Sequence, residues 1–245
     1  PTPTPTPPPA TGWPDASNTG YSVTLTARSG FTVNTAGTVV ENLDINGTLT
    51  VNAPNVTVRN NRITAGFFGI DATSNARGMI AEDNVIIGGG DSGIAATQAG
   101  DMIIRRNEIY GGVDGMKIAG FNMQVTDNYL HSPGGGADSH NDGIQCYGNG
   151  TDLVFRHNWI TWKDTSTISL FEGQHTWNRV TIDNNHLTNA GYLVYAGGTT
   201  ASNVQITNNV FGNWGYAHPV TDWITKTGNV WSGNKDLSGN TVSAP

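Results

Sequence analysis

The sequence has 245 residues, enough for one large all-β domain or two small ones. With 32 glycines, 12 lysines and arginines together and only 13% charged residues, it is typical of a turn-rich chain rather than a helical one. The net charge of -7 argues against nucleic-acid or membrane-surface partners, no apolar run is long enough to span a membrane, and the single Cys146 excludes an internal disulfide.

Residues 1–10 form a Pro/Thr-rich segment, which predicts an extended polyproline-type linker because such a density of proline permits neither a helix nor a sheet. It resembles the linkers that join modules of secreted bacterial polysaccharide-degrading enzymes. We therefore expect one module of a larger extracellular protein, whose partners include other modules of the same chain and whose signal peptide lies upstream or has been removed. The alternative is a disordered tail of no consequence.

One pattern recurs through the remaining residues, 11–245: apolar, any, apolar, any, any, Asn, any, apolar. It runs from VTVRNNRI at 56–63 to VQITNNVF at 204–211, with TVVENLDI at 38–45 as an imperfect copy. Its apolar alternation predicts a strand, and asparagine tolerates left-handed backbone, so it can turn the chain between two strands. Stacked copies can form a hydrogen-bonded ladder. The asparagines, 21 to 30 residues apart, are Asn61, Asn84, Asn107, Asn128, Asn158, Asn185 and Asn209.

A second motif, glycine followed by an apolar residue, occurs between these asparagines as GIDA at 69–72, GIAA at 93–96, GMKI at 115–118 and GIQC at 143–146. Each repeat then holds a short strand, a variable loop and another strand. The sequence predicts an all-β, right-handed parallel β-helix of about 8–9 coils spaced by about 4.8 Å, with residues 11–37 and 212–245 closing its ends. A propeller or sandwich would require hairpins and other periods.

This repeat resembles the pectate-lyase-like superfamily over about residues 31–230, and GWPDASNTG at 12–20 is similar to the start of many uncharacterised actinobacterial proteins of this kind. The resemblance implies that the Gly-apolar strands carry a substrate groove on their outer face. Strand alternation predicts an outward column of Asp71, Ala95, Lys117, Gln145 and Ser169. A second column just before these strands contains Phe68, Ser92, Asp114, Asp142 and Ser166.

The stretch DSHNDGIQCYG at 138–148 lies at the lip of this face. In a first interpretation, Asp114, Asp138 and Asp142 bind Ca²⁺, which prefers oxygen ligands. The ion would neutralise a uronate carboxylate of a polysaccharide while Lys117 removes the C5 proton, as the resemblance to lyases implies. His140 and Gln145 would position the substrate, and Arg105 or Arg156 would bind the sugar acid.

In a second interpretation, Asp114 and Asp142 are the acid and base of a glycoside hydrolase. Inverting enzymes hold these carboxyls roughly 6.5–9.5 Å apart, whereas adjacent coils are closer. NDGI at 141–144 resembles part of a polygalacturonase motif, but the other motifs of that family are missing. In a third interpretation the two aspartates only accept backbone hydrogen bonds at turns, and the protein is a non-catalytic carbohydrate-binding or adhesion module, or an elongated spike.

Several further residues are candidates for substrate binding. Tyr129 and Trp159 are expected to stack on the exterior as a sugar-binding strip, unless loops cover them. Glu172 and His175 are predicted to extend the groove as a second acid/base pair. Arg105 and Arg156 also belong to a column of alternating charge that is typical of a solvated ion-pair ladder. We expect a secreted monomer that acts on or binds a polysaccharide.

Overall fold

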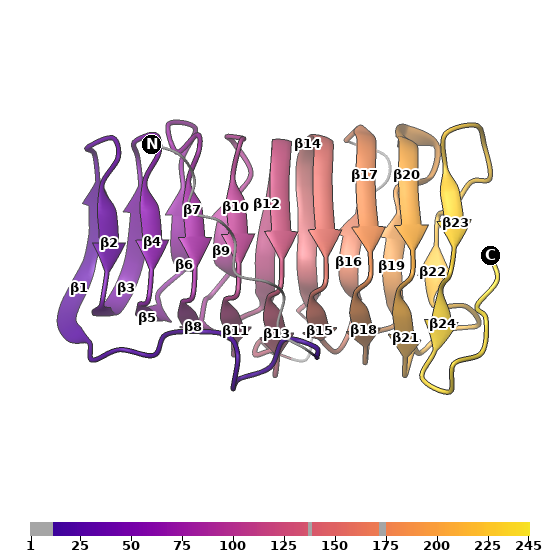
Figure 1. Cartoon of the computed structure of the whole chain (residues 1–245), viewed down its shortest axis with the longest axis horizontal. Helices are drawn as coiled ribbons and strands as arrows, with labels where there is room; N and C mark the ends of the chain where they lie inside the picture. Colours follow the sequence, from indigo (N-terminus) through magenta and orange to yellow (C-terminus); the bar gives the residue numbers. More distant parts are fainter. Residues whose placement is uncertain (1–11, 137–138, 172–174) are drawn as a thin grey trace.

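The computed structural model describes residues 12–136, 139–171 and 175–245. The chain winds into a parallel β-helix in which each coil contributes one short strand to each of three walls (Figure 1). Successive coils pair in parallel, as β6 does with β9 and β14 with β16. The predicted fold is confirmed. Within the described part of the chain, no helix has the length and apolar character needed to cross a membrane.

The three walls are defined by their strands. The first wall contains β2 (Val39–Glu41), β4 (Thr57–Arg59), β7 (Ile80–Glu82), β10 (Ile103–Arg105), the ends of β12 (Asp114–Thr126) and β14 (Asp142–Arg156), β17 (Trp177–Asp183), β20 (Ala201–Thr207) and β23 (Val230–Ser232). The second wall contains the start of β3 (Leu43–Val51), β5 (Arg62–Ala65), β8 (Val85–Gly88), β11 (Glu108–Tyr110), β13 (Tyr129–His131), β15 (Trp159–Thr161), β18 (His186–Thr188), β21 (Val210–Gly212) and β24 (Lys235–Asp236). The third wall contains the end of β3, β6 (Phe68–Ala72), β9 (Ser92–Ala96), the starts of β12 and β14, β16 (Ser166–Leu170), β19 (Tyr192–Ala196) and β22 (Val220–Thr221).

The repeated asparagines form the predicted ladder between the first and second walls. Asn128 shows the pattern: its Oδ1 accepts the backbone N–H and the side-chain amide of Asn107, both at 3.0 Å. Its own amide donates to Asn158 Oδ1 and to backbone carbonyls. These side chains are fully buried, so the ladder satisfies polar groups that would otherwise be costly to bury. It extends one coil beyond the predicted repeat, to Asn234.

The left-handed residue of each turn is not the ladder asparagine, as the sequence suggested, but the residue before it. Most of these residues are Asn or Asp, which adopt positive φ more readily than other side chains. Two exceptions have acidic partners on the preceding coil: Arg106 forms an ion pair with Asp83 at 2.7 Å, and His157 forms a hydrogen bond with Asp127 at 2.7 Å. The positive-φ residues that precede ladder positions in the central coils are Asn60, Asp83, Arg106, Asp127, His157, Asn184 and Asn208.

Aliphatic columns fill the inside of the tube. On the second wall, one buried column consists of Ile45, Ile63, Ile86, Ile109, Leu130, Ile160, Leu187 and Phe211, all with no exposed surface. Burying such side chains contributes about 1.5–3 kcal/mol each. Cys146 is also fully buried, and burial raises the pKa of its thiol, consistent with a small core residue.

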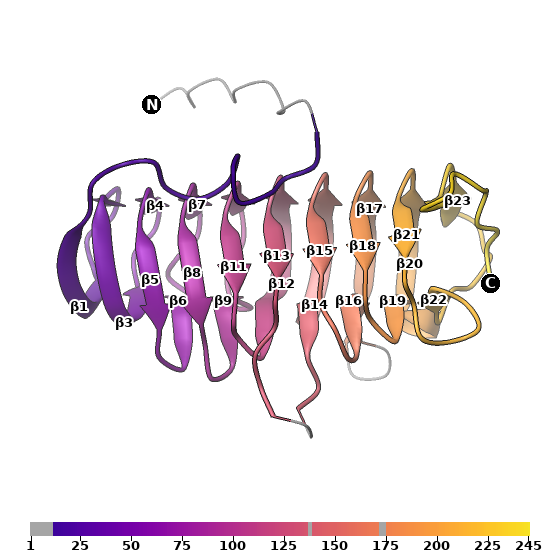
Figure 2. The same ribbon diagram turned by 90° about the horizontal axis from the view of Figure 1, so that it is seen from below.

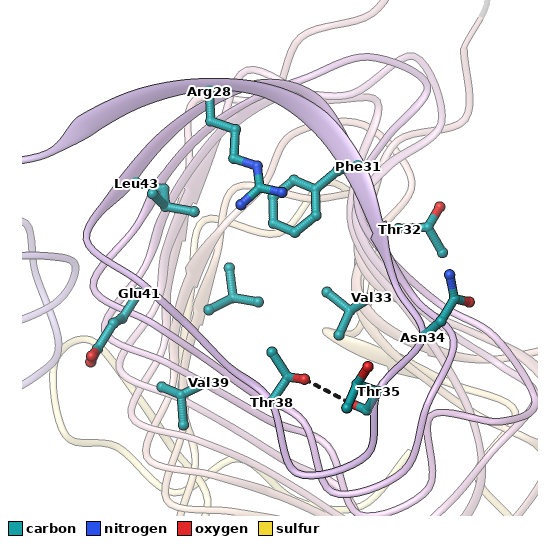
Figure 3. Close-up of a pocket in the computed structure, with 11 residues that line it drawn as sticks. Arg28, Phe31, Thr32, Val33, Asn34, Thr35, Thr38, Val39, Glu41 and Leu43 are labelled. Atoms are coloured by element: carbon teal, nitrogen blue, oxygen red, sulfur yellow. Dashed lines mark hydrogen bonds between the residues drawn. The ribbon is translucent and has the colours of Figure 1, made fainter.

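The two ends of the tube differ. At the C-terminal end, Trp223 and Trp231 pack on the core, and the Trp231 indole donates to the Val242 carbonyl at 2.9 Å. At the N-terminal end, β1 (Thr26–Val33) leaves a cavity of about 420 Å³, beside which the Arg28 guanidinium lies 3.4 Å from the centre of the Phe31 ring (Figure 3).

Residues 12–25 do not cover that end of the tube, although the sequence suggested closure by residues 11–37. Instead this segment runs along the stack of coils (Figure 2). The Gly20 N–H donates to the Arg106 carbonyl at 3.0 Å, and Trp13 stacks on His157 and His186 with ring centres 5.2 and 5.5 Å apart. The segment therefore lies on the second wall.

Candidate functional site

The third wall carries the predicted outward column. Lys117 is paired in register with Ala95 on one side and Gln145 on the other, and Gln145 with Ser169. The same register continues to Tyr195 on β19. Residues 28 or fewer positions apart in sequence thus become neighbours on one outer surface.

Lys117 lies between two carboxylates. Its Nζ is 2.7 Å from Asp91 Oδ2 and 3.5 Å from Asp114 Oδ2, and its side chain is 21% exposed. Asp91 was not among the predicted site residues. It lies one coil upstream, 26 residues before Lys117. The repeat length of the coils could therefore have predicted that Asp91 and Lys117 are neighbours. The ammonium is arranged to hold negative charge rather than to accept a proton.

Asp114 and Asp142 are linked from coil to coil. The Asp142 N–H donates to Asp114 Oδ1 at 2.9 Å, and the Ser166 hydroxyl donates to Asp142 Oδ1 at 2.5 Å. Gln145 donates to Asp142 Oδ2 over a longer 3.3 Å. We call Lys117, Asp91, Asp114, Asp142, Gln145 and Ser166 the Lys117 cluster.

Glycines explain why both aspartates are buried, with 3% and 1% of their surface exposed. Gly115 and Gly143 follow them, and a Cβ on Gly115 would lie 2.4 Å from the Gly143 carbonyl oxygen and 2.7 Å from Leu130. Only glycine lets adjacent coils approach this closely at the start of the strand. The sequence placed these aspartates at the groove lip but did not show that they would be this deeply enclosed.

Burial is the main cause of the altered acidity of both aspartates. It raises the pKa of Asp114 to about 7, while the hydrogen bond from the Asp142 backbone N–H opposes this rise, the charge of Asp142 adds to it and the charge of Lys117 opposes it. It raises the pKa of Asp142 to about 6, against the hydrogen bonds from Ser166 and Gln145. The two acids therefore change protonation close to neutral pH, which suits proton transfer.

Of the three Ca²⁺ ligands predicted from the sequence, Asp114 and Asp142 lie on adjacent coils. Asp138 lies outside the described residues, and the oxygens of Asp114 and Asp142 face the backbone, hydroxyl, amide and ammonium donors of the protein itself. No group of three or more His, Cys, Asp or Glu side chains within the described ranges is arranged to hold a metal ion. These residues alone do not fit a Ca²⁺ site.

The two predicted histidines lie at opposite edges of the third wall. His140 is exposed, and its charge lowers the pKa of Asp142, which places it near the cluster. His175 follows β16 and contacts Tyr147 edge-on, with ring centres 5.2 Å apart. Its Nε2 is buried and has no hydrogen-bond partner in the described part of the chain. Its predicted partner, Glu172, lies outside the described residues.

Arg105 and Arg156 are not part of the Lys117 cluster. They lie at the ends of first-wall strands, where Arg105 pairs with Glu82 at 2.7 Å and Arg156 with Asp183 at 3.0 Å. Both belong to a cross-coil charge column, which was the alternative interpretation from the sequence. Both arginines lie on the first wall, whereas Lys117 lies on the third wall.

Tyr129 and Trp159 stack as predicted, with ring centres 5.3 Å apart, but they are not an open sugar-binding strip. The N-terminal segment crosses their wall: Trp13 stacks on His186, whose ring lies 5.1 Å from that of Trp159. Burial raises the pKa of Tyr129, and the charge of Asp15 contributes. Both side chains are half-buried, and the N-terminal segment lies beside them on the same wall.

Comparisons with known proteins agree with this architecture. The model of a family described as "right handed beta helix region" matches residues 16–161. The A-module of mannuronan C-5 epimerase AlgE6 from Azotobacter vinelandii has a similar structure, with a TM-score of 0.59 at 13% identity, covering 87% of this chain and 70% of that one. DFA-IIIase from Arthrobacter chlorophenolicus A6, without its lid, gives a TM-score of 0.45 at 14% identity, covering 86% and 54%.

At these identities the structural similarities concern the fold alone. A comparison with curated proteins gave no match. The family match covers more than half of the residues, and the coils, the asparagine ladder and the parallel walls agree with it. The chain belongs to the family of right-handed β-helix proteins.

Proposed function

We propose that this protein is a secreted enzyme that cleaves an acidic polysaccharide by β-elimination at the Lys117 cluster. The observation that carries the proposal is the pair Asp114 and Asp142, two enclosed acids with pKa values of about 7 and about 6 next to a lysine. Such shifted acids beside a charge partner on an outer strand favour proton transfer over a purely structural turn.

The roles follow from charge and position. The Lys117 ammonium and the Gln145 amide would hold the carboxylate of a uronate unit, since both belong to the outward column. Ionised Asp142 would take the C5 proton, and the electron pair of the C–H bond would form the C4–C5 double bond as the C4–O bond breaks. Protonated Asp114 would give its proton to the leaving oxygen.

These roles reverse those that the sequence suggested for lysine and aspartate. The reversal follows from the ion pair of Lys117 with Asp91 at 2.7 Å, which engages the ammonium with an acidic partner. A lysine so placed can do electrostatically what the predicted Ca²⁺ would do, namely stabilise the negative charge that develops on the sugar carboxylate. No step above requires a metal ion.

Inverting hydrolysis by the same aspartates fits the geometry less well. The direct contact between the Asp142 N–H and the Asp114 carboxylate places these residues side by side on adjacent coils. An inverting hydrolase holds its carboxyls roughly 6.5–9.5 Å apart, so that water fits between them.

A screen of uronate polymers, each with Ca²⁺ and with chelator, tests the proposal. Elimination creates an unsaturated sugar end that absorbs in the ultraviolet. New reducing ends without that absorbance indicate hydrolysis, and retention on insoluble polymer without any product indicates a binding module. Activity that survives chelation supports Lys117 as the carboxylate-binding group, whereas loss of activity supports a Ca²⁺ site that includes Asp138.

A further inference from the structure

Three tyrosines gather on the third wall beyond the Lys117 cluster. The rings of Tyr192 and Tyr216 have centres 4.5 Å apart and are tilted by 32°, and Tyr195 meets Tyr192 edge-on at 5.5 Å. Tyr216 is 59% exposed, one of the most exposed large apolar side chains in the described residues. Because these rings form a contiguous group and not a single exposed side chain, they are a candidate ligand-binding surface.

The position of Tyr216 is built into the fold. It belongs to the loop between β21 and β22, whose Gly215 N–H donates to the carbonyls of Ala190 and Gly191 at 3.0 Å. A Cβ on Gly191 would lie 2.8 Å from the Tyr216 ring, so glycine permits the ring to pack over the backbone. The loop thus places the ring beside Tyr192 at the start of β19.

The pairing of neighbouring strands places this aromatic pair close to the Lys117 cluster. Tyr192 is paired with Ser166, whose hydroxyl donates to Asp142. Tyr192 is therefore two coils from Asp142, a distance of about 10 Å at the usual strand spacing. A chain lying along the stack and bound at Lys117 would reach these rings.

A cavity lies between the two features, at the loops that precede β14 and β16. It measures about 500 Å³ and is lined by Gly135, Gly136, Asn141, Lys163 and Asp164. Asn141 is 2% exposed, and its Oδ1 has no hydrogen-bond partner in the described part of the chain. A buried acceptor without a partner is costly, so a donor such as a sugar hydroxyl would be favourable there.

We propose that Tyr192 and Tyr216 form a stacking subsite for a pyranose ring of the same acidic polysaccharide, with the Asn141 and Lys163 cavity between it and the Lys117 cluster. The inference rests on the proposed function. Aromatic faces contact the apolar C–H face of a sugar, the Asn141 oxygen accepts from a hydroxyl, and the exposed Lys163 ammonium attracts a uronate carboxylate. The enzyme would therefore prefer chains long enough to span both sites.

The test compares oligomers of increasing length, drawn from the uronate polymer that the wild type binds or cleaves. The affinity of the wild type should rise when the oligomer becomes long enough to reach the tyrosines. Tyr216→Ala should not show this increase in affinity with oligomer length. Compared with the wild type, its dissociation constant should be about three- to tenfold higher for long oligomers and unchanged for short ones. Tyr216→Phe should behave as the wild type, because it keeps the ring.

Phe121→Ala is the matched control, since Phe121 is an exposed ring, 40% exposed, on another part of the surface. If Tyr216→Ala binds long oligomers as tightly as the wild type, the subsite is refuted while the proposed function stands. If the wild type neither binds nor cleaves any acidic polymer, both proposals fail together. A length-dependent loss in Tyr216→Ala, absent in Phe121→Ala, supports the subsite.

Discussion

The backbone N–H of Asp142 donates to the carboxylate of Asp114 on the preceding coil, at 2.9 Å. This bond joins two acids that are 28 residues apart in sequence, and Asp114 also lies 3.5 Å from the Lys117 ammonium. Stacking of coils alone creates the arrangement, since neither residue is near the other along the chain.

Replacing Lys117 with alanine should abolish turnover of an acidic polymer without unfolding the protein. Lys117 is on the outer column and 21% exposed, so its loss removes charge rather than core packing. Initial rates and a thermal melt of each variant measure the two effects. Lys235→Ala, an exposed lysine of β24, is the control and should keep full activity. Equal loss in both variants would argue against a role for Lys117.

Activity should peak between about pH 6 and about pH 7. The base Asp142 must be ionised, which requires a pH above its pKa of about 6, and Asp114 must be protonated, which requires a pH below its pKa of about 7. Because the two residues interact, the two limbs of the profile belong to the pair. The ratio kcat/KM measured against pH checks this. A rate that keeps rising well above pH 8 would contradict Asp114 as the acid.

The pKa of Asp114 also predicts how stability depends on pH. Its folded pKa of about 7 exceeds the usual value of 3.8, so the folded state holds the proton more tightly. The stabilisation of the folded state by this proton is fully present below about pH 4 and is lost as the pH rises toward 7. Each unit of difference between the folded and unfolded pKa corresponds to about 1.4 kcal/mol of unfolding free energy. Asp114→Asn should remove part of this decrease in stability between about pH 4 and about pH 7. Urea unfolding at several pH values measures it, with the exposed Asp164→Asn as control.

Replacing the central ladder residue Asn128 with alanine should lower the free energy of unfolding by about 2–4 kcal/mol. The backbone N–H of Asn107 would lose its acceptor, and two buried carbonyls would lose a donor. Chemical denaturation of this variant is compared with Asn75→Ala, which removes an exposed asparagine. Similar losses in the two variants would mean that the ladder adds little stability.

Trp13→Ala should lower the melting temperature but leave turnover of the acidic polymer unchanged. Trp13 holds the N-terminal segment against His157 and His186, far around the coil from Lys117. If the second wall were instead a sugar-binding strip, exposing Tyr129 and Trp159 would strengthen binding of polymer. Melting curves and binding assays on the same variant distinguish these outcomes.

The fold could be predicted because its determinants repeat. The asparagine at each turn, with apolar residues at fixed offsets before it, is sufficient to define the coils. Strand alternation was sufficient to predict that Lys117 and Gln145 belong to the same outward column. Even here a detail differed: the left-handed residue precedes the ladder asparagine, and at that position Arg106 and His157 adopt positive φ and contact an aspartate of the preceding coil.

The site was only partly predictable because contacts between coils depend on loop lengths and close packing. Asp91 meets Lys117 through the period of the coils, yet nothing near Lys117 in sequence points to it. The burial of Asp114 depends on how tightly Gly115 approaches the next coil. Likewise, only the structure shows that residues 13–21 lie beside the aromatic pair Tyr129 and Trp159 on the second wall.

A uronate polymer deuterated at C5 tests the central claim most directly, because elimination must break the bond from C5 to its hydrogen. Wild type should form the unsaturated product more slowly from the deuterated polymer than from the ordinary one, and Asp142→Asn should lose formation of this product while remaining folded. Unsaturated product formed at the wild-type rate by Asp142→Asn would contradict the assignment of the Lys117 cluster as the reaction centre.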